Sequence, residues 1–175
     1  MRRYLAAILL GSAIGPGAVS AAPAPFGLEI GADCGAVEQY HAQSQGVSAI
    51  TSGTIYQISG DQIDFEGVQS VTVICDGQQH ISAVIASLQK RFRGATFDRL
   101  VNILRDDYQL VELNEAHVGN QDARFRDGDV AIVVDEPHMS RTTSLIYKTE
   151  AFSQAFAEYQ QQQRREQQEQ EAGQL

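Results

Sequence analysis

The sequence contains no tryptophan, and only seven phenylalanines and six tyrosines occur among its 175 residues. It also lacks the Gly-x-Ser-x-Gly turn of serine hydrolases, the Gly-Lys loop that binds phosphates and the glycine-rich dinucleotide fingerprint. The sequence therefore offers no aromatic-rich platform for sugars and none of the common motifs of hydrolases or nucleotide-dependent enzymes. We expect a protein without a cofactor, and we assign no catalytic residue from the sequence.

Cysteine is scarce as well, because Cys34 and Cys75 are the only two in the chain. Cys75 lies in the segment VICDGQQH, where His80 could sit across a turn from it. A thiol enzyme needs such a base within reach of a thiolate. Cys75, however, alternates with Val71 and Val73, and this pattern favours a buried, unreactive thiol. Cys34 is the better thiolate candidate, because a helix start lowers the pKa of a thiol.

Two cysteines in an exported chain favour a disulfide over two reactive thiols. We predict a bond between Cys34 and Cys75, which would close a loop of 41 residues. In the chain-entropy description, such a bond stabilises the fold by roughly 3–4 kcal/mol. A thiol-dependent enzyme centred on either cysteine is the alternative.

Histidine and the acidic residues do not form a recognisable metal motif. No two of the histidines have the four-residue spacing of a helical metal site, and no acidic group has the order of a calcium loop. The acids near glycine and proline are typical of turns. We predict no metal site. The residues considered are His41, His80, His117 and His138, the acids Asp61, Asp64 and Glu66, and the pairs Asp127 with Asp129 and Asp135 with Glu136.

The beginning of the chain has the pattern of a secretory signal. Arg2 and Arg3 precede the apolar run Leu5–Leu10, and small residues then lead to Ala21. We predict cleavage near Ala21 and export to the periplasm. Glycine and proline residues interrupt the apolar run well short of the roughly 20 residues that a membrane span needs. The mature protein is therefore expected to have no transmembrane span.

The charge of the chain is strongly one-sided, with 13 basic and 22 acidic residues and a net charge of −9. Residues 1–21 contain two arginines and no acid, so the mature chain keeps 11 basic and 22 acidic residues, a net charge of −11. Such a chain is repelled by nucleic acids and by anionic lipids, and it is attracted to basic surfaces. We expect a protein partner in the cell envelope and no nucleic acid.

Alternation of apolar and polar residues predicts most of the strands, and one of them stands out. The run VAIVV at residues 130–134 is apolar on both faces, which predicts a central strand covered on both sides. Residues 43–53 are polar and are predicted to form a loop. The predicted strands are residues 26–30, 54–59, 70–75, 110–113, 123–126, 129–135 and 144–149.

Helices are predicted at three places, each preceded by a residue that can cap it. Asp33 precedes a short helix, Thr96 a longer one and Thr149 a final one. Residues 81–89 fit helical spacing but follow a turn signal at Asp76 and are rich in Ile and Val. We interpret them as a strand, with a helix as the alternative.

These elements predict an α+β domain, with a mostly antiparallel sheet and about three helices packed on one face in two layers. We expect one domain over residues 22–159, after a signal peptide at residues 1–21. Residues 160–175 are rich in Gln and Glu and have no apolar stripe. They are expected to be a disordered tail or a solvated helix.

The segment FGLEIGADCGAVEQY resembles the first motif of small envelope proteins of the SmpA/OmlA (BamE-like) type, in which Gly-Leu-x-x-Gly leads into a short helix. The matching residues are Gly27, Leu28, Gly31 and Val37. The segments LVNILRDDY and ARFRDGDVAIVVD look similar to uncharacterised exported proteins of Gram-negative bacteria. The resemblance implies a small, exported, non-enzymatic module, and it identifies no binding residues.

Three functional hypotheses follow from these observations. The leading one is a periplasmic, disulfide-stabilised binding or accessory protein of the cell envelope, which acts by contact and is not an enzyme. The first alternative is an acidic inhibitor or immunity protein against a basic hydrolase or toxin, because acidic surfaces accelerate binding to cationic enzymes. The second alternative is a thiol-dependent enzyme that uses Cys34 or Cys75.

Overall fold

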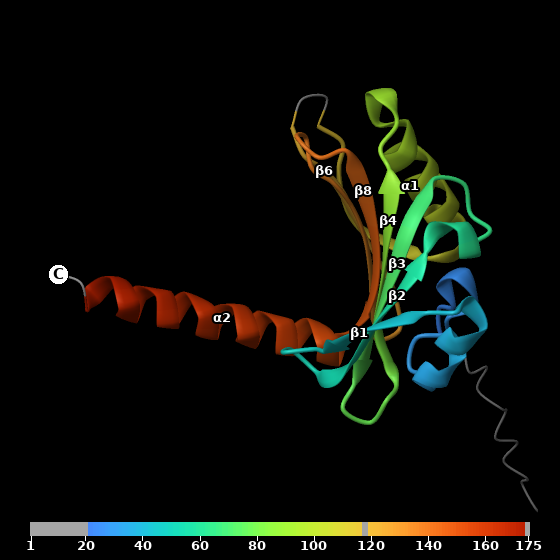
Figure 1. Ribbon diagram of the computed structural model, residues 1–175. Helices are drawn as coiled ribbons and strands as arrows, with labels where there is room; N and C mark the ends of the chain where they lie inside the picture. Colours follow the sequence, from blue (N-terminus) through green and yellow to red (C-terminus); the bar gives the residue numbers. More distant parts are fainter. Residues whose placement is uncertain (1–20, 117–118, 174–175) are drawn as a thin grey trace, which may run out of the picture.

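The computed structural model describes residues 21–116 and 119–173 (Figure 1). The predicted signal peptide, apart from Ala21, therefore lies outside the described residues, and so does His117. Searched over the described residues, the chain has no helix that is both long and apolar enough to cross a membrane.

Eight strands form a single antiparallel sheet in the order β1-β2-β3-β4-β8-β7-β6-β5. The predicted α+β class and the mostly antiparallel sheet are thus confirmed. Residues 81–89 are a strand, as interpreted from the sequence. The strands are β1 (Gln43–Val47), β2 (Ser52–Ser59), β3 (Val68–Asp76), β4 (Ile81–Gln89), β5 (Gln109–Asn114), β6 (Gln121–Asp127), β7 (Val130–Glu136) and β8 (Thr142–Thr149).

One face of the sheet carries the main core. The helix α1 (Ala95–Asp107) packs there through Phe97, Leu100 and Leu104, which are buried at helical spacing. Figure 1 shows α1 on the same side as the short 3-10 helices at the beginning of the chain. The 3-10 helices are η1 (Pro25–Gly27), η2 (Cys34–Tyr40), η3 (Gly60–Gln62) and η4 (Phe92–Gly94).

The last helix, α2 (Glu150–Ala172), leaves the sheet on the opposite side from α1 (Figure 1). Thr149 caps it, as predicted, because the Thr149 Oγ1 accepts a hydrogen bond from the Phe152 N–H at 3.0 Å. Phe152 packs against Ile74 and Ala83, and every residue from 160 to 173 is exposed. The expectation of three helices on one face is therefore wrong, because the apolar stripe of α2 ends after its first turns.

Three local predictions are also wrong, for identifiable reasons. Residues 26–30 are not a strand, because Pro25–Gly27 form the 3-10 helix η1 and residues 28–30 continue as irregular chain and a turn. Residues 43–53 include β1, which pairs with β2 although all of its side chains are exposed. Gly94, and not Thr96, is the N-cap of α1. The Thr96 hydroxyl instead donates to the Gln89 carbonyl at 3.0 Å.

The opposite face of the sheet, called the uncovered face below, is only partly buried. In β7, Val130, Ile132, Val134 and Glu136 are buried, whereas the alternate residues are half-buried. The prediction that VAIVV is covered on both sides is thus wrong, because α2 contacts only the end of the sheet from which it starts. The uncovered face leaves apolar side chains in contact with solvent.

Candidate functional site

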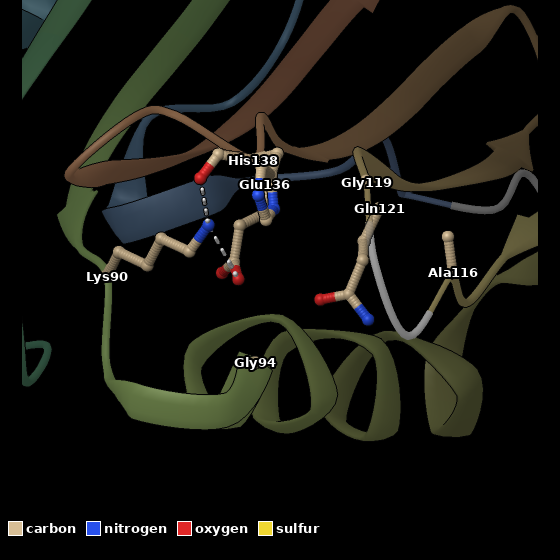
Figure 2. Close-up of a pocket in the computed structure, with 7 residues that line it drawn as sticks. All are labelled: Lys90, Gly94, Ala116, Gly119, Gln121, Glu136 and His138. Atoms are coloured by element: carbon tan, nitrogen blue, oxygen red, sulfur yellow. Dashed lines mark hydrogen bonds and ion pairs between the residues drawn. The ribbon is translucent and has the colours of Figure 1, made fainter.

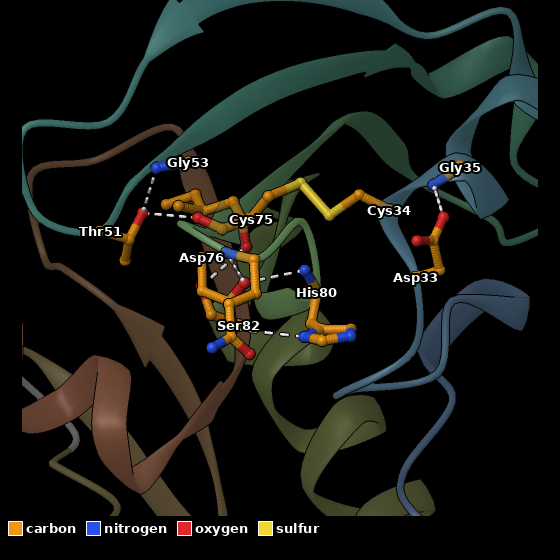
Figure 3. Close-up of a disulfide and its surroundings, with 11 residues drawn as sticks. Asp33, Cys34, Gly35, Thr51, Gly53, Cys75, Asp76, His80 and Ser82 are labelled. Carbon is orange, nitrogen blue, oxygen red and sulfur yellow. Dashed lines mark hydrogen bonds and ion pairs between the residues drawn. A yellow bond between two sulfur atoms is a disulfide. The ribbon is translucent and has the colours of Figure 1, made fainter.

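The two cysteines predicted to pair are joined in the structure (Figure 3). The Sγ atoms of Cys34 and Cys75 are 2.02 Å apart, and the residues are 2% and 0% exposed. The bond ties η2 to β3 on the core side of the sheet. No free cysteine is present in the described part of the chain, so the thiol-dependent hypothesis would require this bond to be reduced first.

His80 does not serve as a base beside the sulfur atoms. Its Nδ1 lies 3.7 Å from Asp76 Oδ2, and its backbone N–H donates to Asp76 Oδ1 at 2.9 Å. The same Asp76 oxygen accepts from the Gln78 N–H at 2.8 Å. Asp76 therefore closes the turn between β3 and β4, and the imidazole of His80 lies beside this carboxylate (Figure 3).

The remaining histidines lie on separate elements, with His41 after η2 and His138 after β7. Within residues 21–116 and 119–173, no group of three or more His, Cys, Asp or Glu side chains could hold a metal ion. Asp61 and Glu66 lie between β2 and β3 and are exposed. Of the acidic residues singled out in the sequence, Glu136 is buried and Asp135 is half-buried on β7.

Glu136 is the most deeply buried acidic residue of the core, at 1% exposure. It continues the inward-facing positions of β7, which places its carboxylate between the sheet and the start of α1 (Figure 2). Thr143, itself 0% exposed, donates to Glu136 Oε2 at 2.5 Å. The sequence interpretation of this residue as part of a turn missed the site, although the alternation Val130, Ile132, Val134 pointed to it.

Lys90 supplies the positive charge for this carboxylate. The Lys90 Nζ is 3.5 Å from Glu136 Oε1, and it donates to the carbonyl oxygens of Pro137 at 3.0 Å and His138 at 3.4 Å. A single ammonium group thus holds the end of β4 against the loop that follows β7. Burial of a charge is costly unless it is paired and hydrogen-bonded, and both conditions are met here.

A pocket of about 500 Å³ opens beside this ion pair (Figure 2). Gln121 and His138 line it together with Glu136 and Lys90, and Gly94 forms part of its wall at the start of α1. The two charged groups that line the pocket, the Lys90 ammonium and the Glu136 carboxylate, compensate each other. The arrangement therefore stabilises this end of the sheet.

The uncovered face carries a continuous row of polar residues, called the polar row below. The row follows the cross-strand pairing and crosses seven strands, at the sheet end where β4 leads toward α1. Four serines occupy the β2, β3, β4 and β8 positions of the row, and two aspartates and an asparagine occupy the β7, β6 and β5 positions. Its members are Ser59, Ser70, Ser87, Ser144, Asp135, Asp122 and Asn114.

The next row across the face is apolar at its centre. Ile85, Ile146 and Val133 are direct cross-strand neighbours, and all three are half-buried. Towards α2 follow Lys148 and Arg126, which line a groove of about 480 Å³ between the base of α2 and β5–β8. An apolar centre with charged residues around it is the usual composition of a protein-binding surface.

The pKa of Asp135 is raised by desolvation and, secondly, by the negative charge of Asp122 on the neighbouring strand. Because the charged form is disfavoured in the folded state, stability falls as the pH rises through the interval between the unfolded and folded pKa values. We expect Asp122→Asn to lower the pKa of Asp135 towards its ordinary value, as measured by NMR titration of the carboxyl group. An unchanged Asp135 titration in this variant would contradict the coupling.

Compared with known protein families, curated proteins and solved structures, the chain matches none of them significantly. What the geometry defines is a disulfide-linked α+β domain with one covered and one uncovered sheet face.

Proposed function

We propose that the protein is an exported accessory protein of the cell envelope that binds a protein partner through its uncovered face and does not act as an enzyme. The observation that carries the proposal is the row Ile85, Ile146 and Val133, which remains half-buried at the centre of a sheet. Apolar surface of this kind gains free energy when a partner covers it.

Two further observations support the location and the mode of action. A disulfide within the core suits an oxidising compartment such as the periplasm. The resemblance of residues 26–40 to the SmpA/OmlA type points to the same compartment. The base of α2 forms a wall beside the face, and the groove between them offers both apolar and charged contacts.

The acidic inhibitor hypothesis is a second candidate, favoured by the net charge of −9. It requires attraction between the acidic chain and a basic enzyme, and such attraction is screened by salt. Binding through the apolar row would instead persist at high salt. The two candidates therefore differ in the salt dependence of the complex.

The experiment compares three baits in an affinity capture from the envelope extract, at low and high salt. Ile146→Lys places a charge at the centre of the uncovered face. Ile103→Lys is the matched control, because Ile103 is 45% exposed on α1 at the other side of the sheet. We expect the wild type and the Ile103 variant to retain the same partner and the Ile146 variant to lose it.

Equal capture by both variants would contradict binding through the uncovered face. Release of the partner from the wild type by salt would favour the inhibitor hypothesis. Thermal unfolding of both variants serves as a control for folding, and Lys at position 146 can extend its ammonium group to solvent from a half-buried position.

A further inference from the structure

The groove between the base of α2 and strands β5–β8, called the α2 groove below, has an apolar floor. It lies in the angle that α2 makes with the sheet (Figure 1). Ile146, Val133 and Ala131 form the floor on β8 and β7, and Val111 extends it at the β5 edge of the sheet. Three strand spacings separate β8 from β5, so the floor is about 14 Å long. The volume of about 480 Å³ is that of a site for a small molecule.

A small residue deepens the α2 groove near its centre. Ala131 on β7 is paired with Lys148 of β8 on one side and with Arg126 of β6 on the other. Both neighbours have long side chains with apolar stems, whereas Ala131 contributes only a methyl group. A hollow therefore remains between the two stems, directly above the sheet.

The charged residues that line the α2 groove are Arg124, Arg126, Lys148, Glu112 and Glu150. Arg124 is 3.5 Å from Glu112 and also 3.8 Å from Asp122 of the polar row. Arg126 is 3.7 Å from Glu150. Within the described residues, Lys148 takes part in no ion pair and no side-chain hydrogen bond. Each arginine of the groove thus has an acidic partner, and the lysine has none.

The next acidic residue along the chain does not supply the missing partner. Asp129 lies in the turn after β6, where its carbonyl oxygen accepts the Glu150 N–H at 3.0 Å, and it does not line the α2 groove. Lys148 is half-buried beside the apolar floor, and a charge in such a position is costly without a counter-charge. The groove is therefore complementary to an anion that is joined to an apolar body.

The charge of the whole protein limits the kind of anion. A net charge of −9 repels ligands with several negative charges, so a single negative charge suits the site best. A carboxylate satisfies this condition and accepts strong hydrogen bonds from an ammonium group. A linear aliphatic chain fits a floor that is long, narrow and open at the β5 edge.

We propose that the α2 groove binds an aliphatic monocarboxylate, such as a fatty acid of medium chain length. The carboxylate pairs with the Lys148 ammonium group. The chain crosses Ala131 and Val133 between the stems of Arg124 and Arg126, and it ends over Val111. This inference goes beyond the proposed function, because it requires no protein partner, although both use the uncovered face.

A tryptophan reporter tests the position and the direction of the ligand. The chain has no tryptophan of its own, so Val111→Trp introduces a single reporter at a position that is 62% exposed. Val47→Trp is the control, because Val47 is 71% exposed on β1 at the opposite edge of the sheet. The probe is dodecanoate below its micelle-forming concentration, brominated either at its last carbon or beside the carboxylate, because bromine quenches tryptophan fluorescence.

We expect the probe brominated at its last carbon to quench the Val111→Trp variant most strongly and the Val47→Trp variant not at all. Equal quenching of the two variants, or no quenching of either, would overturn the proposal. Stronger quenching of the Val111→Trp variant by bromine beside the carboxylate would show that the chain is reversed, and would overturn the assignment of Lys148.

The contribution of the charge is tested with Lys148→Gln in the same reporter chain. Competition against the brominated probe gives the affinities of unlabelled dodecanoate and of neutral dodecanol. Lys148→Gln should weaken dodecanoate about tenfold, because a hydrogen bond to a charged group is lost, and should leave dodecanol unchanged. Arg105→Gln on α1, where Arg105 is 41% exposed, is the control that should change neither. Equal loss for both ligands, or no loss, would contradict pairing with Lys148.

The hollow itself is tested with Ala131→Leu, which fills it from the floor. This variant should lose both dodecanoate and dodecanol, whereas Ala157→Leu, at an exposed position of α2, should bind both as before. Thermal unfolding of the two variants controls for folding. Unchanged binding by a folded Ala131→Leu variant would exclude the α2 groove as the site.

These outcomes can be distinguished from those of the capture experiment. If dodecanoate does not bind but the Ile146→Lys bait loses its envelope partner, the ligand site is excluded and the proposed function stands. If dodecanoate binds as expected but every bait captures equally, the ligand site stands and the envelope partner does not use the uncovered face.

Discussion

Replacing both Cys34 and Cys75 with serine is expected to lower the free energy of unfolding by roughly 3–4 kcal/mol. The bond connects residues separated by 41 positions, and without it the unfolded chain gains the freedom of that loop. The loss should be measured by urea denaturation of the wild type and the double variant, with a steeper slope for the double variant, because its unfolded chain is less compact.

Reductant provides the control for this experiment. The wild type in reductant should fall to the stability of the double variant, and the double variant itself should not respond. Equal stability of the wild type and the double variant under oxidising conditions would contradict a structural role for the bond. A loss of function in a variant that remains fully folded would instead revive the thiol-dependent hypothesis.

Glu136→Ala is expected to lower the free energy of unfolding by about 3–5 kcal/mol, because it leaves Lys90 and Thr143 without their buried partner. The Lys90 Nζ is 3.5 Å from the carboxylate, and Thr143 donates to it from a fully buried position. The measurement is again urea denaturation, together with amide exchange at the β4 end that Lys90 attaches.

Glu66 provides a matched control, since it also interacts with two basic residues, Arg91 and Arg99. Its side chain is 67% exposed, and the hydrogen bond from Arg91 is the main cause of its lowered pKa. Water and salt screen such a pair, so Glu66→Ala should change stability little. Similar losses for the two variants would contradict the importance of burial at Glu136.

Apolar replacement of the whole pair separates the cost of an unpaired charge from the value of the ion pair. Lys90→Met combined with Glu136→Leu should be clearly more stable than Glu136→Ala alone, because no charge is then left buried without a partner. A combined variant as unstable as Glu136→Ala would show that the polar contacts of Lys90 with the loop after β7 are the larger contribution.

Helices and strands whose apolar residues recur with a strong periodicity are predicted well from the sequence. The apolar stripe of α1 and the strands around residues 54–59 and 70–75 are confirmed, because their apolar residues recur with the period of the element and include buried core positions such as Ile58 and Val71. Strand β1 could not be found in this way, since none of its side chains is buried and only backbone pairing with β2 defines it. The 3-10 turn at Pro25 likewise depends on local backbone geometry and not on periodicity.

The candidate site was predictable only where a residue type itself limits the chemistry. Two cysteines in a chain with a predicted export signal indicated their own pairing, and Cys34 and Cys75 are indeed bonded. The buried ion pair of Glu136 could not be predicted, because the sequence does not show which end of its strand is buried. Its partner Lys90 is also 46 positions away in sequence. The polar row depends on the register of seven strands, and no local pattern in the sequence contains that information.

The position of β8 in the sheet has a consequence for the order of folding. In the order of the sheet, the first four strands meet the last four where β8 pairs with β4, as between Ile85 and Ile146, 61 positions apart in sequence. Until β8 has been synthesised and has paired with β4, β4 is an exposed edge strand that can pair with other chains. Cys34 and Cys75 both belong to the part of the chain that contains β1–β4, which is synthesised before β5–β8. Formation of their disulfide can therefore stabilise β1–β4 before β8 pairs with β4.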